Sequence, residues 1–103
     1  MRAALIAAAL VASLAAAEAS AERVVKSMPA CRTRQDLEEL GRFRVKGDQR
    51  AIQDLFDRQR CIVPKLGMEV SRLETPFAEG IVKARFYSTA GSIDLWTYVE
   101  AVK

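Results

Sequence analysis

The chain contains no histidine, only two cysteines and only five glycines among its 103 residues. Without histidine, the usual catalytic triads and most zinc sites cannot be built. The glycines form neither a phosphate-binding nor a dinucleotide-binding loop, and no G-x-S-x-G motif is present. We therefore expect a protein that is not an enzyme and has no cofactor-binding, metal-binding or catalytic residues.

The two cysteines, Cys31 and Cys61, show no sign of reactive chemistry. They do not form a C-x-x-C motif, and no histidine is available to lower the pKa of a thiol. A single pair allows one intramolecular connectivity, so the sequence predicts a structural Cys31–Cys61 disulfide. Closing a loop of about 30 residues stabilises a small domain by roughly 3–4 kcal/mol in the chain-entropy model. Such a bond persists in an oxidising compartment.

The first residues are typical of a secretory signal peptide. Arg2 precedes an apolar run over residues 3–14, and the small residues 19–21 form an A-x-A cleavage site. We expect cleavage after Ala21, with Ala17 as the alternative site. A retained membrane anchor is the other interpretation, but the run is shorter than the roughly 20 residues that a spanning helix needs. The prediction is a periplasmic or secreted protein with no transmembrane span after cleavage.

Residues 22–103 have the length of one small domain, which we divide into a helical half (30–60) and a strand half (61–102). The net charge of +3 and the pI of about 9.1 are mildly basic. An exported protein rarely meets nucleic acid, so we expect no nucleic-acid partner. A basic surface facing an anionic cell envelope fits the charge equally well.

Two helices are predicted between the cysteines. The first begins at the capping residue Thr33 and ends at Gly47, and the second begins after Asp48. Each has an apolar stripe at helical spacing. The segment 22–29 ends in a proline, so we expect an irregular lead-in with at most one helical turn. The expected surface ion pairs are Glu38 with Arg42 and Asp54 with Arg58.

The strand half alternates apolar and polar residues between turn signals, which predicts three or four short antiparallel strands. The alternation slips at Leu73, and a β-bulge would explain the slip. The segment Cys61–Val63 stops at Pro64, as an edge strand can. A loop is expected over 75–80. The other expected strands are 68–73, 81–87 and 93–100, and the expected turns are 65–67 and 88–91.

One part of this half resembles a known family. The run K-L-G-M-E-V-S-R-L (65–73) is similar to the K-x-G-x-x-V-x-V hairpin of bacterial SH3-like domains. The runs I-V-K-A-R-F (81–86) and S-I-D-L-W-T-Y-V (92–99) resemble the strands that follow it. The resemblance covers residues 61–102 and implies a non-catalytic binding module acting at the cell wall or on peptides. The family's first strand, N-V-R-x-G-P, is missing, and two helices stand in its place, so no binding residue is transferred.

The fold expected from these observations is α+β, with two N-terminal helices packed on a small antiparallel sheet that curls toward an SH3-like barrel. Arg85, Tyr87, Trp96 and Tyr98 form the candidate binding surface. Packing against the helices is the preferred interpretation for Trp96, whereas both interpretations stay open for Tyr87 and Tyr98. The partner would be a protein, a peptide or a cell-wall component. Two other functions remain open: an accessory subunit of a larger exported assembly, and an inhibitor of an exported hydrolase that uses loop 75–80.

Overall fold

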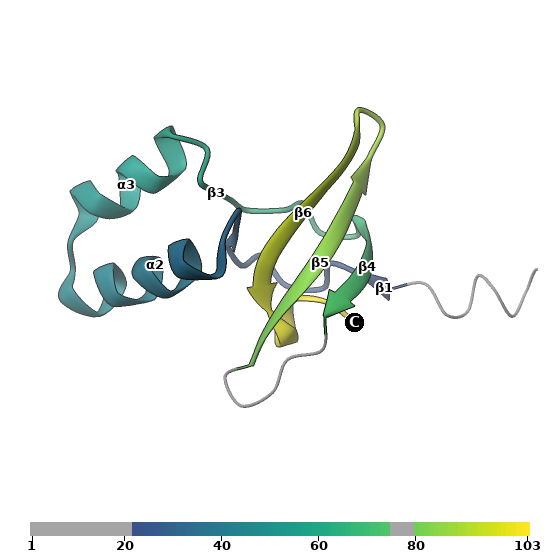
Figure 1. Ribbon diagram of the computed structural model, residues 1–103, viewed down its shortest axis with the longest axis horizontal. Helices are drawn as coiled ribbons and strands as arrows, with labels where there is room; N and C mark the ends of the chain where they lie inside the picture. The colour runs from purple at the N-terminus through teal and green to yellow at the C-terminus, as the bar shows by residue number, and fades with distance from the viewer. Residues whose placement is uncertain (1–21, 75–79) are drawn as a thin grey trace, which may run out of the picture.

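The computed structural model describes residues 22–74 and 80–103, which form an α+β fold of two helices and a six-stranded antiparallel sheet (Figure 1). The hydrogen-bonded strand order is β1-β4-β5-β6-β2-β3. The proposed signal peptide (1–21) and all of loop 75–80 except Gly80 lie outside the described residues. The elements are β1 (Glu22–Arg23), β2 (Ala30–Cys31), α2 (Arg34–Lys46), α3 (Gln49–Asp57), β3 (Cys61–Ile62), β4 (Glu69–Glu74), β5 (Ile81–Ser88), β6 (Gly91–Tyr98) and the 3-10 helix η1 (Val99–Ala101).

Both helices begin, and α2 also ends, where the capping residues predict. The hydroxyl oxygen of Thr33 accepts a hydrogen bond from the backbone N–H of Asp36 at 3.0 Å. Gly47 ends α2 in the left-handed region, at a φ of 70°, where glycine carries no Cβ penalty. The carboxylate of Asp48 then accepts from the N–H of Ala51 at 3.2 Å and opens α3.

The long strands also follow the sequence pattern. Strands β5 and β6 pair along their whole length through a two-residue turn that joins Ser88 to Gly91. The register between β4 and β5 shifts between Arg72 and Glu74, which confirms the bulge predicted at Leu73. β3 is the outermost strand at one end of the sheet, as Pro64 predicted.

The lead-in before Cys31 differs from the prediction. It is not irregular throughout, because Glu22 and Arg23 form β1 and pair with β4, and Val24 bridges to Val102. The backbones of Arg23 and Lys103 exchange two hydrogen bonds of 3.0 Å, so the C-terminal residues return to the outer side of β1. Strand β2 also precedes the helices, so α2 and α3 lie between two strands and not ahead of the whole sheet. The two ends of the strand order, β1 and β3, are not paired, and the sheet is open.

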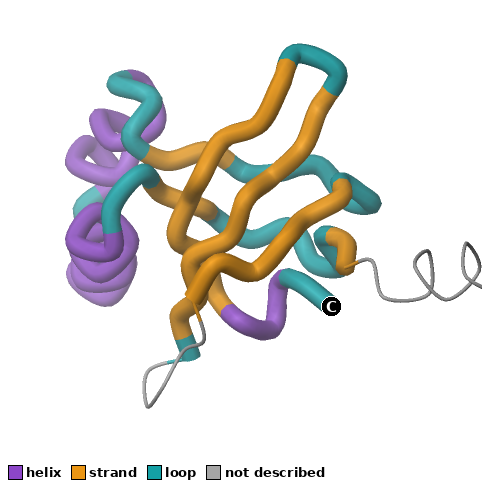
Figure 2. Tube along the Cα trace, turned by 45° about the vertical axis from the view of Figure 1, so that its right-hand side comes forward, coloured by secondary structure: helices purple, strands orange, loops and turns teal. Residues whose placement is uncertain are grey.

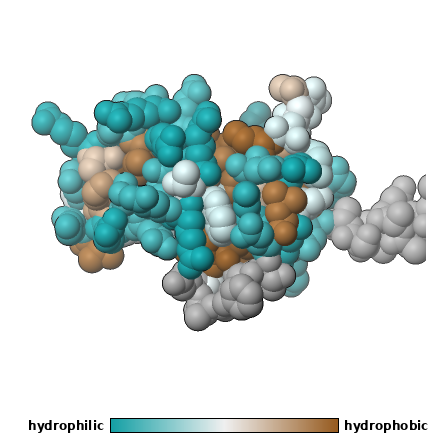
Figure 3. Space-filling view, viewed as in Figure 1, coloured by the Kyte–Doolittle hydropathy of each residue, from teal (hydrophilic) through white to brown (hydrophobic). Residues whose placement is uncertain are grey.

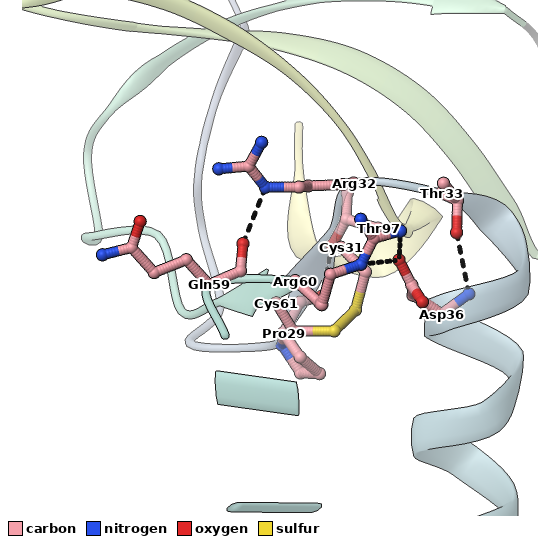
Figure 4. The surroundings of a disulfide bond; sticks show 9 residues. All are labelled: Pro29, Cys31, Arg32, Thr33, Asp36, Gln59, Arg60, Cys61 and Thr97. Atoms are coloured by element: carbon pink, nitrogen blue, oxygen red, sulfur yellow. Dashed lines mark hydrogen bonds and ion pairs between the residues drawn. A yellow bond between two sulfur atoms is a disulfide. The ribbon is translucent and has the colours of Figure 1, made fainter. Parts of the chain in front are cut away.

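The disulfide is present and joins residues that lie directly opposite each other in β2 and β3 (Figure 4). The Cα atoms of Cys31 and Cys61 are 4.0 Å apart, and both side chains are buried. Cys31 also pairs with Trp96 of β6, so both cysteines belong to the sheet. The bond therefore closes the base of the segment that carries α2 and α3.

The buried apolar side chains form two clusters, because successive side chains along a strand point to opposite faces of the sheet. One cluster lies among the strands and the C-terminal segment, and the other lies between the helical pair and the sheet. Figure 2 shows that the tip of the β5–β6 hairpin extends away from the helical pair. The first consists of Val24, Ala30, Val70, Val82, Ala84, Phe86, Leu95 and Val102. The second consists of Cys31, Leu37, Leu40, Leu55 and Cys61, with Phe43, Ile52, Phe56, Ile81, Trp96 and Tyr98 packed against it.

Candidate functional site

The four candidate residues share one face of the β5–β6 hairpin. Arg85 and Tyr87 alternate along β5, and Trp96 and Tyr98 alternate along β6. The register places Lys83 opposite Trp96 and Arg85 opposite Asp94, so the two strands contribute to the same face. We call this face, from Lys83 to the hairpin tip, the hairpin surface. It is the continuation of the face on which the helices pack.

The two ends of this face differ in exposure. Tyr98 packs against the helical cluster, and its hydroxyl would lie 3.9 Å from a Cβ at Gly41 of α2. Tyr87, nearer the hairpin tip, is 36% exposed, and its hydroxyl donates to the hydroxyl of Ser71 at 3.2 Å. Tyr98 thus lies under the helical pair, while Tyr87 belongs to the open part of the sheet.

Trp96 lies at the boundary between the covered and the open part. Its side chain is half-buried and packs against the helical cluster. The ammonium of Lys83 lies 5.9 Å from the centre of its ring, and the guanidinium carbon of Arg34 lies 6.0 Å from it. Both distances are within reach of a cation–π contact. The ring is therefore held in place by apolar packing on one side and by two cations beside it.

Arg85 and Asp94 form a bidentate ion pair on the hairpin surface. Nε of Arg85 donates to Oδ1 of Asp94 at 2.8 Å, and Nη2 donates to Oδ2 at 3.2 Å. The hydrogen bond from Arg85 holds the pKa of Asp94 below its ordinary value, and the same bond raises the pKa of Arg85. Both side chains are exposed, so the pair orients these groups more than it stabilises the fold.

Two cationic neighbours of Trp96, Lys83 and Arg34, were not among the candidate residues predicted from the sequence. Lys83 could have been found, because it alternates with Arg85 on the same strand. The contact of Arg34 with Trp96 could not have been found, because it joins the first turn of α2 to β6 and follows no periodic pattern.

Of the two ion pairs predicted on the helix surfaces, one is present. Asp54 pairs with Arg58 at 3.2 Å, whereas Glu38 pairs with Arg34 and Arg42 lies 3.8 Å from Glu39.

A hollow with a volume of about 240 Å³ lies between the two helices. Phe43 and Leu55 contribute apolar surface to it, and charged side chains from both helices surround them. Arg60 and Arg58 already hold carboxylates there, in the pairs Asp36–Arg60 and Asp54–Arg58. Over residues 22–74 and 80–103, no three cysteine or acidic side chains are grouped so that they could hold a metal ion.

No helix in the described part of the chain has the length and apolar content needed to cross a membrane. The comparisons with known proteins find no matching family model, no matching curated protein and no matching solved structure.

Proposed function

We propose that residues 22–103 form a small, exported, non-catalytic binding module of the bacterial cell envelope. The single observation that carries the proposal is the position of Trp96. Its half-buried ring is fixed by the helical cluster and flanked by Lys83 and Arg34, and it borders an open sheet surface that presents Arg85 and Tyr87. The partner is a protein, a peptide or a cell-wall component.

The hairpin surface combines features that favour recognition. Aromatic side chains supply large contact areas with few rotatable bonds, and they are enriched at the energetic centres of interfaces. Arg85 and Asp94 are held in a defined geometry, and strands position side chains more rigidly than loops do. The hairpin surface therefore presents hydrogen-bond donors and acceptors beside an aromatic ring. Such a surface suits a ligand that has both polar groups and a flat apolar face.

Two features support export, and a third is compatible with an SH3-like character. The A-x-A site at residues 19–21 comes immediately before Glu22, the first residue of β1, so cleavage after Ala21 would leave every described element intact. The disulfide is of the kind that persists in an oxidising compartment. The strands β4, β5 and β6 pair in sequence order as an antiparallel meander, which is compatible with the resemblance, and the chain then returns through η1 to β1.

Site-directed photocrosslinking in cells tests the hairpin surface. A photoreactive phenylalanine analogue at position 87 should yield a discrete crosslinked species in envelope fractions. The same analogue at position 66, where Leu66 is exposed in the turn before β4 and outside the hairpin surface, should not. Changing Lys83 and Arg85 to serine should weaken the crosslink from position 87. Equal crosslinking from positions 66 and 87, or none from position 87, would contradict the proposal.

An accessory subunit is the second candidate function, and the exposed apolar edge favours it. Strand β3 ends the sheet, and the neighbouring Val63 is 51% exposed. A strand edge with apolar side chains is suited to a permanent contact with another chain. Size-exclusion chromatography of native envelope extract separates the two functions. A discrete large complex that Val63→Asp dissociates supports the subunit, and a free monomer supports the binding module.

The inhibitor hypothesis depends on loop 75–80, of which only Gly80 is described, so the structure adds no support to it.

A further inference from the structure

The last turn of α2 carries the most exposed large apolar side chain described in the structure. Val45 is 89% exposed, and every residue from 44 to 50 is exposed. We call residues 44–50 the helical tip. It lies at the end of the helical pair that is farthest from the sheet (Figure 1), and the space-filling view shows apolar surface among hydrophilic side chains at this end of the molecule (Figure 3).

The helical tip is rich in cations that are not neutralised by carboxylates. In the described part of the chain, Arg44, Lys46 and Arg50 take part in no ion pair. The one carboxylate of the tip, Asp48, accepts the capping hydrogen bond from Ala51. By contrast, Arg58 at the other end of α3 holds Asp54 at 3.2 Å. The helical tip therefore presents a local excess of positive charge around an apolar side chain.

Helix stability accounts for only part of this arrangement. Arg44 and Lys46 lie in the last turn of α2, where cations interact favourably with the helix dipole. Arg50 lies in the first turn of α3, where a cation is unfavourable for the same reason. The exposure of Val45 also contributes nothing to the fold. The tip thus contains two features that its own helices do not require, one basic and one apolar.

We propose that the helical tip docks on the surface of an anionic phospholipid bilayer. Cations near such a surface are attracted by the lipid phosphates, and their aliphatic stems can follow an apolar side chain into the interface. Arg44, Lys46 and Arg50 would contact the phosphates while Val45 enters the boundary of the acyl chains. This site is separate from the hairpin surface, so a bound partner and a membrane could be held at the same time.

Vesicle co-sedimentation of the exported protein tests the proposal. The mass of the protein is measured first, to confirm that the disulfide is intact. The protein should sediment with vesicles of phosphatidylglycerol and phosphatidylcholine and not with vesicles of phosphatidylcholine alone. Each cation removed should weaken binding about fivefold at low salt. The double variant Arg44→Glu and Lys46→Glu should therefore lose well over tenfold. The matched control, Lys65→Glu and Lys103→Glu, changes the net charge equally at positions outside the helical tip and should bind within about twofold of the wild type.

Val45→Asn provides the second arm, because it leaves the charge unchanged at a position that is 89% exposed, where folding should not suffer. It should weaken vesicle binding severalfold, and Val45→Trp should strengthen it. An equal loss in the Lys65 and Lys103 control would show that only net charge matters and would overturn the proposal. Unchanged binding by Val45→Asn would overturn it as well. Neither result bears on crosslinking at position 87, so the two proposals fail independently.

Discussion

Asp36 has two roles at the start of α2. Its backbone N–H completes the cap with Thr33, and its carboxylate Oδ2 accepts from Nε and Nη2 of Arg60 at 3.0 and 2.6 Å. Arg60 immediately precedes Cys61, so this pair lies beside the disulfide (Figure 4). At the scale of single residues, the base of the helical segment is held by one covalent bond and one partly buried ion pair.

The first prediction concerns this ion pair. Asp36→Asn should lower the free energy of unfolding by about 1–3 kcal/mol, because it leaves the guanidinium of Arg60 without its anion in a partly buried place. Asp54→Asn is the matched control, since it breaks the exposed pair with Arg58 and should cost about 0–1 kcal/mol. Urea unfolding of the three proteins gives both values. Equal losses in the two variants would mean that burial does not strengthen the Asp36–Arg60 pair.

The second prediction concerns the pH dependence of the hairpin surface. The pKa of Asp94 is lowered in the folded state, so its contribution to stability is present above its ordinary value of 3.8 and is lost as the pH falls through the lowered folded pKa. Arg85→Gln should move this pKa back up, because the hydrogen bond from Arg85 is the largest cause of the shift. Carboxyl NMR titration of Asp94 measures the change. An unchanged titration in Arg85→Gln would contradict the assignment, and Arg58→Gln serves as the distant control.

At the scale of elements, Gly41 inside α2 and Gly47 at its C-terminal cap have opposite effects on helix stability. Gly47 ends the helix at a φ of 70°, whereas Gly41 lies inside the helix, where an added Cβ would have only the hydroxyl of Tyr98 nearby, at 3.9 Å. Gly47→Ala should therefore destabilise the protein by about 1 kcal/mol, whereas Gly41→Ala should stabilise it by about 0.5–1 kcal/mol. Thermal unfolding of the two variants should shift in opposite directions. Shifts of the same sign would show that the end of α2 is not fixed at Gly47.

The elements that could be predicted from the sequence are those with capping residues at their ends or a long alternation of apolar and polar residues. Thr33, Gly47 and Asp48 mark helix ends through interactions within four residues, and the strands β5 and β6 are long enough to show alternation. The disulfide followed from there being only two cysteines. Strands β1 and β2 have two residues each, which is too short for any periodic pattern, and they exist because distant segments pair with them.

The candidate site was predictable to a similar extent. Alternation placed Arg85 with Tyr87 and Trp96 with Tyr98, and the observed register joins these pairs on one face. The division of that face into a covered and an open part could not be read from the sequence. It depends on where α2 crosses β6, and the contact of Arg34 with Trp96 joins residues that are distant along the chain. Tertiary packing, and not local preference, decides which aromatic residue remains accessible.

At the scale of the whole molecule, the structure consists of a sheet and a helical pair, and one disulfide lies where the two parts meet. The helices enter through β2 and leave through β3, and the disulfide joins these two strands at the base. The apolar cluster around Leu37, Leu40 and Leu55 includes the two cysteines, whereas the cluster around Phe86 and Leu95 does not. The two clusters should therefore depend on the disulfide to different degrees.

The last prediction follows from this division. Changing Cys31 and Cys61 to alanine should lower the free energy of unfolding by roughly 3–4 kcal/mol, because the unfolded chain regains the freedom of a loop of about 30 residues. Hydrogen exchange should show the loss of protection first in α2, α3 and β3, while β5 and the part of β6 near the hairpin tip keep theirs longer. Gly47→Ala in the oxidised protein is the control, since it destabilises α2 without opening the base. Uniform loss of protection in the double alanine variant would mean that the helical pair and the sheet unfold as one unit and that the disulfide serves the whole fold.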